Sequence, residues 1–323
     1  MRIVGWVTLL TPFIAFAQVP QTAWKPDRPV EIVIGAAPGG ANDRIGRTLQ
    51  RLLQDSSLVG SALAVNKPGG GQSVAFAYVS SHAGNPHYLG LASSSRLTTV
   101  AAGRGTVTPR DLTPIVKVLD EYQIYFVRTD SPIASARDIV ERLRKDPTSL
   151  SFGFSTAAGN PLHISIAALA RQAGADPAKV KAVVFNSGTD TAIQVAGGHL
   201  DVGVQSPGSA YQLAQAGKIR LIAVGAPKRY GGALANVPTL REQGVDVDAN
   251  VFYTVFAPKG IESAQAAYWD QAISSVMHST EVKKDSELNY WTIDLIGHRE
   301  LPTFLEREME LYRRALQDIG MVK

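Results

Sequence analysis

Apolar runs, turns rich in small polar residues and helical patterns follow one another in a repeated order along this 323-residue chain. The first unit consists of the apolar run 30–34, the turn 35–40 and a segment whose apolar residues recur with helical spacing from Ile45 to Leu53. Strands that alternate with helices predict parallel sheets covered by helices on both faces. The same order returns with apolar runs at 151–154, 181–185 and 201–204.

Two β-rich runs, at 122–127 and 251–256, stand far apart in the sequence. Two strands that leave one lobe and return to it are what a two-lobed protein with a hinge requires. The length of the chain also favours two lobes, because single hydrophobic cores stop growing near roughly 250 to 300 residues. We therefore expect lobe 1 to comprise 18–123, lobe 2 to comprise 124–253, and the chain to return to lobe 1 over 254–323. The last helix of that return presents one apolar face, formed by Leu305, Met309, Tyr312 and Leu316.

The first residues have the pattern of a secretory signal peptide. Met1 and Arg2 form a short positive region, the stretch 3–16 is apolar, and 15–17 is an A-x-A cleavage site. We expect residues 1–17 to be removed and the mature protein to be periplasmic. The alternative is an uncleaved anchor, but the apolar stretch is short of the roughly 20 residues that a membrane-spanning helix needs.

Composition and charge exclude several classes of partner. The chain carries a net charge of +4, but Lys and Arg are spread along it, which argues against a nucleic-acid partner. A diffuse positive potential favours anionic small molecules only modestly. The chain has no cysteine, and its six histidines show no metal-binding spacing. We therefore expect neither a metal nor another cofactor.

Two turns have the composition of an anion site. Gly39 and Gly40 allow a ligand to approach the main chain, and the helix that follows presents unpaired N–H groups at its positive end. A carboxylate is stabilised at such a place without a cationic side chain. Asn42 and Asp43 are residue types that either cap a helix or bind a ligand. The turn 155–160 is likewise rich in hydroxyl groups and small residues and precedes a helix.

Two enzyme alternatives fit these turns less well. The segment 153–157 is close to the nucleophile elbow of serine hydrolases, with His163 or His199 as a base, but 159–161 separates the serine from its helix. The turn 35–40 follows the first strand, as in dinucleotide-binding proteins, yet it lacks the G-x-G-x-x-G spacing. The pattern therefore favours a binding protein over an enzyme.

Five short motifs together resemble the periplasmic solute-binding proteins of tripartite tricarboxylate transporters, also called Bug-type receptors. Each motif alone is weak, but all five occur in the family's order and extend over essentially the whole mature chain. In chain order they lie at 25–30 with 37–43, at 65–71, at 197–201, at 237–244 and at 256–260.

This resemblance implies a two-lobed periplasmic-binding-protein fold, the Venus flytrap, in which each lobe is a mainly parallel sheet flanked by helices and two crossing strands join the lobes. It also implies a monomer that captures a small carboxylate and delivers it to the membrane permease subunits of the transporter. A sensor receptor that presents its ligand to a signalling protein remains an alternative. The resemblance assigns the first-lobe contacts to Gly39, Gly40, Ala41, Asn42, Asp43, Ser93, Ser94 and Ser95. It assigns the second-lobe contacts to Ser155, Thr156, Ala157, Asn160, His163, Asn186, Ser187, Gly188, Thr189, Gln205 and Ser206.

Overall fold

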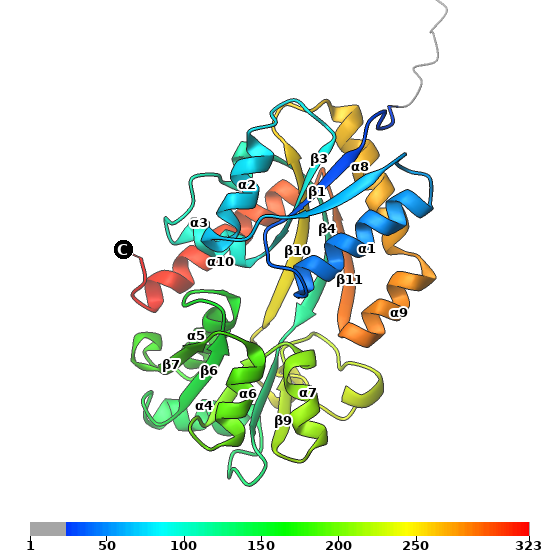
Figure 1. The fold of residues 1–323 in the computed structure, drawn as a ribbon. Helices are drawn as coiled ribbons and strands as arrows, with labels where there is room; N and C mark the ends of the chain where they lie inside the picture. The colour runs from blue at the N-terminus through cyan, green and yellow to red at the C-terminus, as the bar shows by residue number, and fades with distance from the viewer. Residues whose placement is uncertain (1–23, 323) are drawn as a thin grey trace, which may run out of the picture.

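The computed structural model describes residues 24–322, where the chain forms two α/β lobes, each built on one sheet (Figure 1). The expected signal peptide 1–17 lies outside the described residues. In spatial order the first sheet contains β11 (Trp291–Gly297), β4 (Leu112–Tyr122), β10 (Asn250–Pro258), β3 (Tyr88–Ser93), β1 (Val30–Ile34) and β2 (Ala62–Asn66). The second sheet contains β7 (Lys181–Phe185), β6 (Ser151–Ser155), β8 (Val202–Gln205), β5 (Ile124–Arg128) and β9 (Ile219–Val224).

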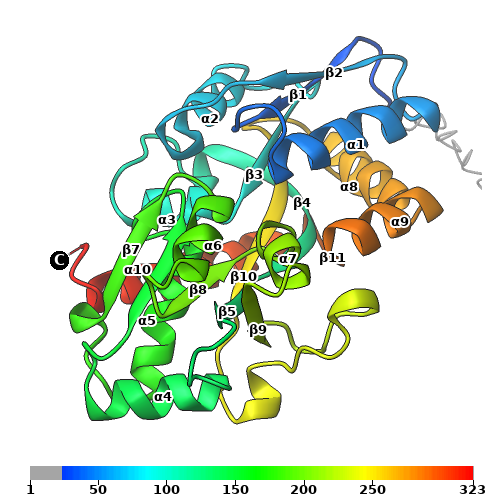
Figure 2. The same ribbon diagram turned by 60° about the horizontal axis from the view of Figure 1, so that its bottom comes forward.

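Helices cover both sheets (Figures 1 and 2). Among residues 24–322, none of them combines the length and the apolar composition that crossing a bilayer requires. The first lobe carries α1 (Ala41–Asp55), α2 (Ser73–Ser80), α3 (Ser95–Ala101), α8 (Ser263–Met277), α9 (Thr280–Asn289) and α10 (Leu301–Asp318). The second carries α4 (Ala136–Lys145), α5 (Pro161–Gln172), α6 (Gly188–Ala196) and α7 (Pro207–Gln215). Short 3₁₀ turns lie at η1 (Gly70–Gln72), η2 (Pro109–Asp111), η3 (Pro177–Lys179), η4 (Gly232–Leu234) and η5 (Arg241–Gln243).

The apolar spacing read from the sequence identifies the buried helix faces correctly. Ile45, Leu49, Leu52 and Leu53 of α1 are all buried, in the core that α1 shares with α8 and β4. On the opposite face of the first sheet, α10 packs with α2 and α3 in a second core. In α10 the predicted apolar face is also the packed face: Leu305, Tyr312 and Leu316 are buried, and Met309 packs partly buried against the same core.

The two-lobed α/β prediction is confirmed, but the sheets are mixed. Parallel pairing joins β1 to β2 and β3, and β6 to β7 and β8, as the strand–helix alternation predicts. By contrast, β10 runs antiparallel to β3 and β4, and β5 runs antiparallel to β8 and β9. The chain first enters the second lobe along β5 and returns to the first lobe along β10, and each strand begins at the edge where the parallel strands end. A strand that starts at this edge must run against the parallel strands.

The two crossings between the lobes are held to each other by main-chain hydrogen bonds. Only Gln123 separates β4 from β5, and its N–H donates to Ala249 O at 2.7 Å. Gly225 N–H donates to Gln123 O at 2.9 Å, and Ala249 N–H donates to Gly225 O at 3.2 Å. Strand β10 pairs with β4 from Asn250 onward, ahead of the return expected at 254. The lobe boundaries as such stay a prediction.

Candidate ligand-binding site

The ends of the parallel strands in both sheets lie next to the crossings. In the first sheet Ser93, which ends β3, stands opposite Tyr253 near the start of β10. In the second sheet Gln205, which ends β8, stands opposite Ile124 at the start of β5. The loops that follow these strands therefore come from two lobes and face one another, with α1 on one side and α6 and α7 on the other (Figures 1 and 2). This is the place where open α/β sheets bind ligands.

The turn between β1 and α1 leaves its main chain open. Gly39 has φ +92°, and Gly40 is the N-cap of α1 without a side-chain capping bond. Both glycines are exposed, and a Cβ added to either would meet nothing within 4 Å. The first N–H groups of α1, at Ala41 and Asn42, have no intrahelical acceptor and stand at the positive end of the helix. The turn can therefore present main-chain donors to an anion.

Asp43 holds this turn in shape. Its carboxylate accepts hydrogen bonds from Gly39 N–H at 2.9 Å, Arg47 Nε at 3.0 Å and Asn66 Nδ2 at 2.8 Å. Asn66 Nδ2 also donates to Ala36 O at 2.9 Å, which ties the turn to β2. Burial raises the pKa of Asp43, but the hydrogen bonds outweigh it and lower that pKa to about 2. Asp43 is thus a buried carboxylate whose oxygens accept hydrogen bonds from the protein itself.

Of the three serines at 93–95, two accept hydrogen bonds from other residues of lobe 1. Gln72 Nε2 donates to Ser93 Oγ at 2.6 Å, and Phe252 N–H donates to Ser94 Oγ at 3.3 Å. Both serines are buried, whereas Ser95 is half-buried and its hydroxyl makes no hydrogen bond within 24–322. The sequence reading missed Gln72, which has φ +72° and also accepts from Ser93 N–H at 3.2 Å. Its place directly after three glycines was the available signal.

A buried chain of polar side chains lies behind the second-lobe loops. Ser155 Oγ donates to Gln205 Oε1 at 3.0 Å, and Gln205 Nε2 donates to Thr191 Oγ1 at 3.0 Å. Gly188, the first residue of α6, lies over this chain, since a Cβ there would be 2.6 Å from Ser209 Oγ and 2.9 Å from Gln205 Oε1. Only glycine fits this close approach. Thr191 was not anticipated, because a threonine within a helix gives no sign of its partner.

The turn after β6 contains a strained residue. Thr156 has φ +78°, a left-handed conformation that is rare for a β-branched residue and costs on the order of 1–3 kcal/mol. Its N–H donates to Phe185 O at 3.0 Å, and its Oγ1 accepts from Asn160 Nδ2 at 2.8 Å. Asn160 also donates to Ser155 O at 2.7 Å and caps α5 by accepting from His163 N–H at 3.0 Å. These bonds hold the exposed edge of the turn in one conformation.

His163 belongs to the same turn and does not pair with Ser155. Its Nδ1 accepts from Gly159 N–H at 3.1 Å, and its ring stacks on Phe154 with centroids 4.8 Å apart. Burial lowers the pKa of His163, which favours the neutral ring. The hydroxyl of Ser155 donates to Gln205 instead. The serine–histidine pair that a hydrolase would need is therefore not formed.

The other expected second-lobe residues divide into exposed and capping positions. Asn186, Thr189 and Ala157 are exposed. Ser187 caps α6 by accepting a main-chain N–H of its first turn at 3.1 Å. Ser206, the N-cap of α7, shares a hydrogen bond of 3.1 Å with Ser209 of that helix. Among residues 24–322, the hydrogen bonds of all the expected site side chains stay within their own lobe. The structure thus assembles two half-sites, and their joint contact with one ligand stays a prediction.

The chain is similar to known proteins in sequence and in fold. The sequence model described as "Tripartite tricarboxylate transporter family receptor" matches residues 46–299. A Cupriavidus necator protein described as "UPF0065 protein in gbd 5'region" is 25% identical over 261 residues, which are 79% of this chain and 77% of the relative. "Protein BugT" of Bordetella pertussis is 23% identical and covers 80% of this chain and 78% of its own length.

Solved structures show the same fold. A TctC solute-binding protein from Polaromonas has a TM-score of 0.75 at 20% identity, covering 90% of this chain and 99% of its own. The R. palustris protein Rpa4515 with adipate has a TM-score of 0.75 at 21% identity, with coverages of 91% and 98%. MatC from Rhodopseudomonas palustris with bound malate has 0.69 at 18% identity, with coverages of 90% and 99%. The matches are to receptors and solute-binding proteins, not to enzymes.

Proposed function

Because the chain belongs to the tripartite tricarboxylate transporter receptor family, we propose that it captures a small carboxylate between its lobes and delivers it to the membrane subunits of such a transporter. The observation that carries this proposal is that two turns, one from each lobe, face each other. The open turn before α1 and the rigid turn before α5 both follow strand ends at the facing edges of the two sheets. Two proteins of the same fold are described with adipate and with malate, which supports a carboxylate ligand.

The chemistry of the half-sites suits a carboxylate. Burying a carboxylate costs several kcal/mol unless it is paired or hydrogen-bonded. Main-chain N–H groups at Ala41 and Asn42, together with hydroxyl groups across the cleft, would offset that cost. A ligand favours the closed form only if it contacts both lobes, and the two crossings at Gln123 and Ala249 are the natural hinge.

We assign different roles to the expected site residues according to burial and hydrogen bonding. Buried residues position the turns, as do His163, Ser187 and Gly188, which are half-buried but bonded or closely packed within their own lobe. The remaining exposed or half-buried residues contact the ligand. The positioning residues are Asp43, Ser93, Ser94, Ser155, Asn160, His163, Ser187, Gly188 and Gln205. The contact residues are Gly39, Gly40, Ala41, Asn42, Ser95, Thr156, Ala157, Asn186, Thr189 and Ser206.

The place of action is part of the proposal. The signal-peptide pattern of 1–17 directs the chain across the cytoplasmic membrane, and the receptors of this family act in the periplasm. We infer that the mature protein meets its ligand there and presents the closed form to the permease subunits. Detection of the mature chain in a periplasmic extract, with Gln18 as its first residue, tests this part.

A thermal-shift screen with mono-, di- and tricarboxylates and amino acids tests the ligand class. A ligand at about one hundred times its Kd stabilises the folded protein by about 2.7 kcal/mol. We expect such a shift with at least one carboxylate. If none of these compounds shifts the melting temperature, carboxylate capture is contradicted.

The variant Gly40→Leu tests where the carboxylate binds. The added side chain has room in the free protein, so the fold is retained, but it covers the main-chain donors at the start of α1. We expect the affinity for the carboxylate found in the screen to fall by about tenfold or more, since a lost charged hydrogen bond is worth about 1.5–3 kcal/mol. Gly60→Leu is the matched control, because Gly60 also has open space but precedes β2. Equal affinities for the two variants would place the ligand elsewhere.

A further inference from the structure

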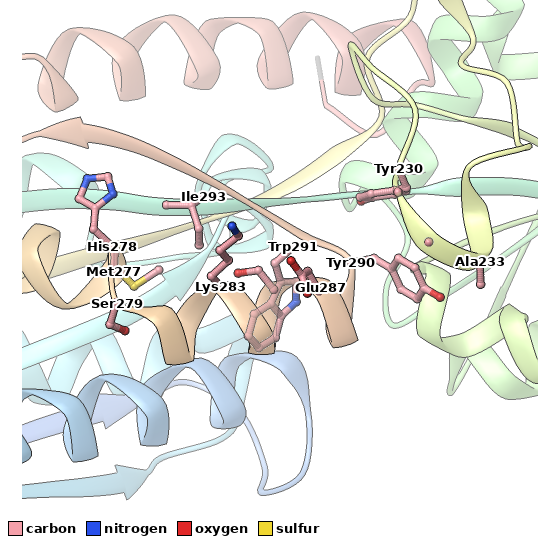
Figure 3. A pocket seen from close by; sticks show the side chains of 13 residues that line it. Tyr230, Ala233, Met277, His278, Ser279, Lys283, Glu287, Tyr290, Trp291 and Ile293 are labelled. Carbon is pink, nitrogen blue, oxygen red and sulfur yellow. The ribbon is translucent and has the colours of Figure 1, made fainter.

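A cavity of about 620 Å³ lies between the two lobes, beside α9 (Figure 3). Residues 230–233, from the segment that leaves the second sheet, form one wall. The turn between α8 and α9, the side of α9 and the start of β11 form the other. The volume lies within the roughly 300–1,000 Å³ of small-molecule sites. None of the residues assigned to carboxylate capture lines this cavity.

The walls of the cavity are aromatic and fixed in position. Tyr230 and Tyr290 lie edge to face with their ring centroids 5.6 Å apart, and the indole of Trp291 is buried next to them. The hydroxyl of Tyr230 accepts from Tyr122 N–H at 3.1 Å and donates to Tyr122 O at 3.2 Å. Tyr290 also contacts Tyr211 of α7, at 6.1 Å between centroids. Rigid aromatic faces of this kind suit a flat apolar ligand.

The polar groups of the cavity favour a single negative charge on the ligand. Lys283 and Glu287 stand one turn apart on α9, and neither forms an ion pair within the part of the chain that the structure describes. Between them, the buried Ser286 Oγ has no hydrogen-bond partner among residues 24–322. Lys283 can pair with one carboxylate, whereas Glu287 would repel a second. Figure 3 shows both side chains on the stretch of α9 that leads to Tyr290.

We propose that this cavity is a second ligand site, specific for aromatic monocarboxylates. Its two walls belong to different lobes. An occupant therefore contacts both lobes and favours the arrangement in which Tyr290 lies against Tyr230 and Tyr211. The site would let an aromatic acid adjust how readily the protein opens and closes around the ligand of the main cleft.

Calorimetry with 2-naphthoate and the neutral 2-naphthamide tests the charge assignment on the full mature chain. An exposed ion pair contributes about 0.2–1 kcal/mol, so we expect 2-naphthoate to bind about 1.4- to fivefold more tightly than the amide. Lys283→Met should remove this preference. An unchanged preference in Lys283→Met would overturn the role of Lys283, and no binding of either compound would overturn the site.

The variant Ala233→Trp tests the position of the site. Ala233 is exposed and lines the cavity, so a bulky side chain there fills the space without disturbing the core. We expect the affinity for 2-naphthoate to fall by about tenfold or more, as the loss of one aromatic contact face predicts. Ala235→Trp is the matched control, because Ala235 is exposed in the same loop and does not line the cavity. Equal binding by both variants would overturn the assignment.

The variant Gly40→Leu separates this proposal from that of carboxylate capture. If the sites are distinct, Gly40→Leu leaves the affinity for 2-naphthoate unchanged, and Ala233→Trp still binds the carboxylate found in the thermal-shift screen. If 2-naphthoate binds only in the main cleft, Gly40→Leu weakens it and Ala233→Trp does not. That result would overturn the second site and leave carboxylate capture intact.

Discussion

The two turns that face each other across the lobes are held in shape by different groups. In the first lobe, the left-handed residue is Gly39, and a charged carboxylate, Asp43, holds the turn from beneath. In the second lobe, the left-handed residues are Thr156 and Gly159, and the neutral side chain of Asn160 holds Thr156. The first turn is therefore unstrained and depends on an ionised group, whereas the second stores backbone strain and depends on neutral hydrogen bonds. The two half-sites should respond differently to substitution and to pH.

Removing the anchor of the first turn should have the largest effect. Asp43→Ala leaves the N–H of Gly39 and the side chains of Arg47 and Asn66 without their shared acceptor. We expect a loss of about 2–3 kcal/mol in the free energy of unfolding, measured by urea denaturation. Asp55→Ala at the other end of α1 is the control. Its exposed carboxylate lies 3.9 Å from Arg51, so a change within about 0.5 kcal/mol is expected. Similar losses in both variants would deny Asp43 an anchoring role.

Acid should weaken the first turn before the second. The pKa of Asp43 is lowered from 3.8 to about 2 in the folded protein, so its stabilising contribution is complete above about pH 4 and is lost as the pH falls toward 2. The contribution amounts to at most about 2.5 kcal/mol, and less where solvent screens the carboxylate. In Asp43→Asn the free energy of unfolding should vary less with pH in this window. A wild-type slope retained in the variant would assign the effect to other carboxylates.

The left-handed glycine can be compared with its neighbour. Gly39→Ala places a Cβ at φ +92°, whereas Gly40→Ala places one at φ −82°, and both positions have open space. The first variant should lose about 1–2 kcal/mol of unfolding free energy, the cost of a left-handed L-residue. The second should change by less than about 0.5 kcal/mol. The difference between the two melting temperatures measures the conformational cost alone, and its absence would mean that the turn can relax.

The smallest effect on stability is expected in the second turn. Thr156→Gly relieves a left-handed strain of about 1–3 kcal/mol, which nearly offsets two losses of about 1 kcal/mol each: the acceptor of Asn160 and the added chain entropy of the unfolded state. The ligand should nevertheless bind more weakly, because the turn is no longer held in one conformation. Thr156→Ser keeps the acceptor and is the control. A large loss of stability in Thr156→Gly alone would show that the hydrogen bond dominates.

Local patterns were sufficient to predict the repeated order of strands and helices that underlies the fold. The strand 30–34 and the apolar face of α1 follow from alternation and helical spacing, which tertiary contacts did not override. The direction of β5 and β10 was not predictable in this way, because a strand's direction depends on which edge of a sheet the chain enters. The break at Gln123, which divides the run 122–127 between two sheets, has no signal in the pattern either.

The sequence predicted which turns form the candidate site, but not which residues position those turns and which contact the ligand. Glycine and hydroxyl composition located the turns at 35–40 and 155–160, since these residue types are needed wherever a main chain must be approached or bent. It did not show that Asp43 faces inward to Asn66 or that Ser155 donates to Gln205. Hydrogen-bond partners that are far apart in the sequence become neighbours only when the strands pair in their final register.

By itself, therefore, the sequence determined the alternation of strands and helices, the buried faces of α1 and α10 and the positions of the bends, since these depend on spacing and residue type over a few positions. Only the tertiary structure decided which polar groups are occupied, which remain open, and which segments meet between the lobes. The meeting of Tyr230 with Tyr290 shows why: the two residues belong to different lobes, and only the path of the chain through the hinge brings their rings together.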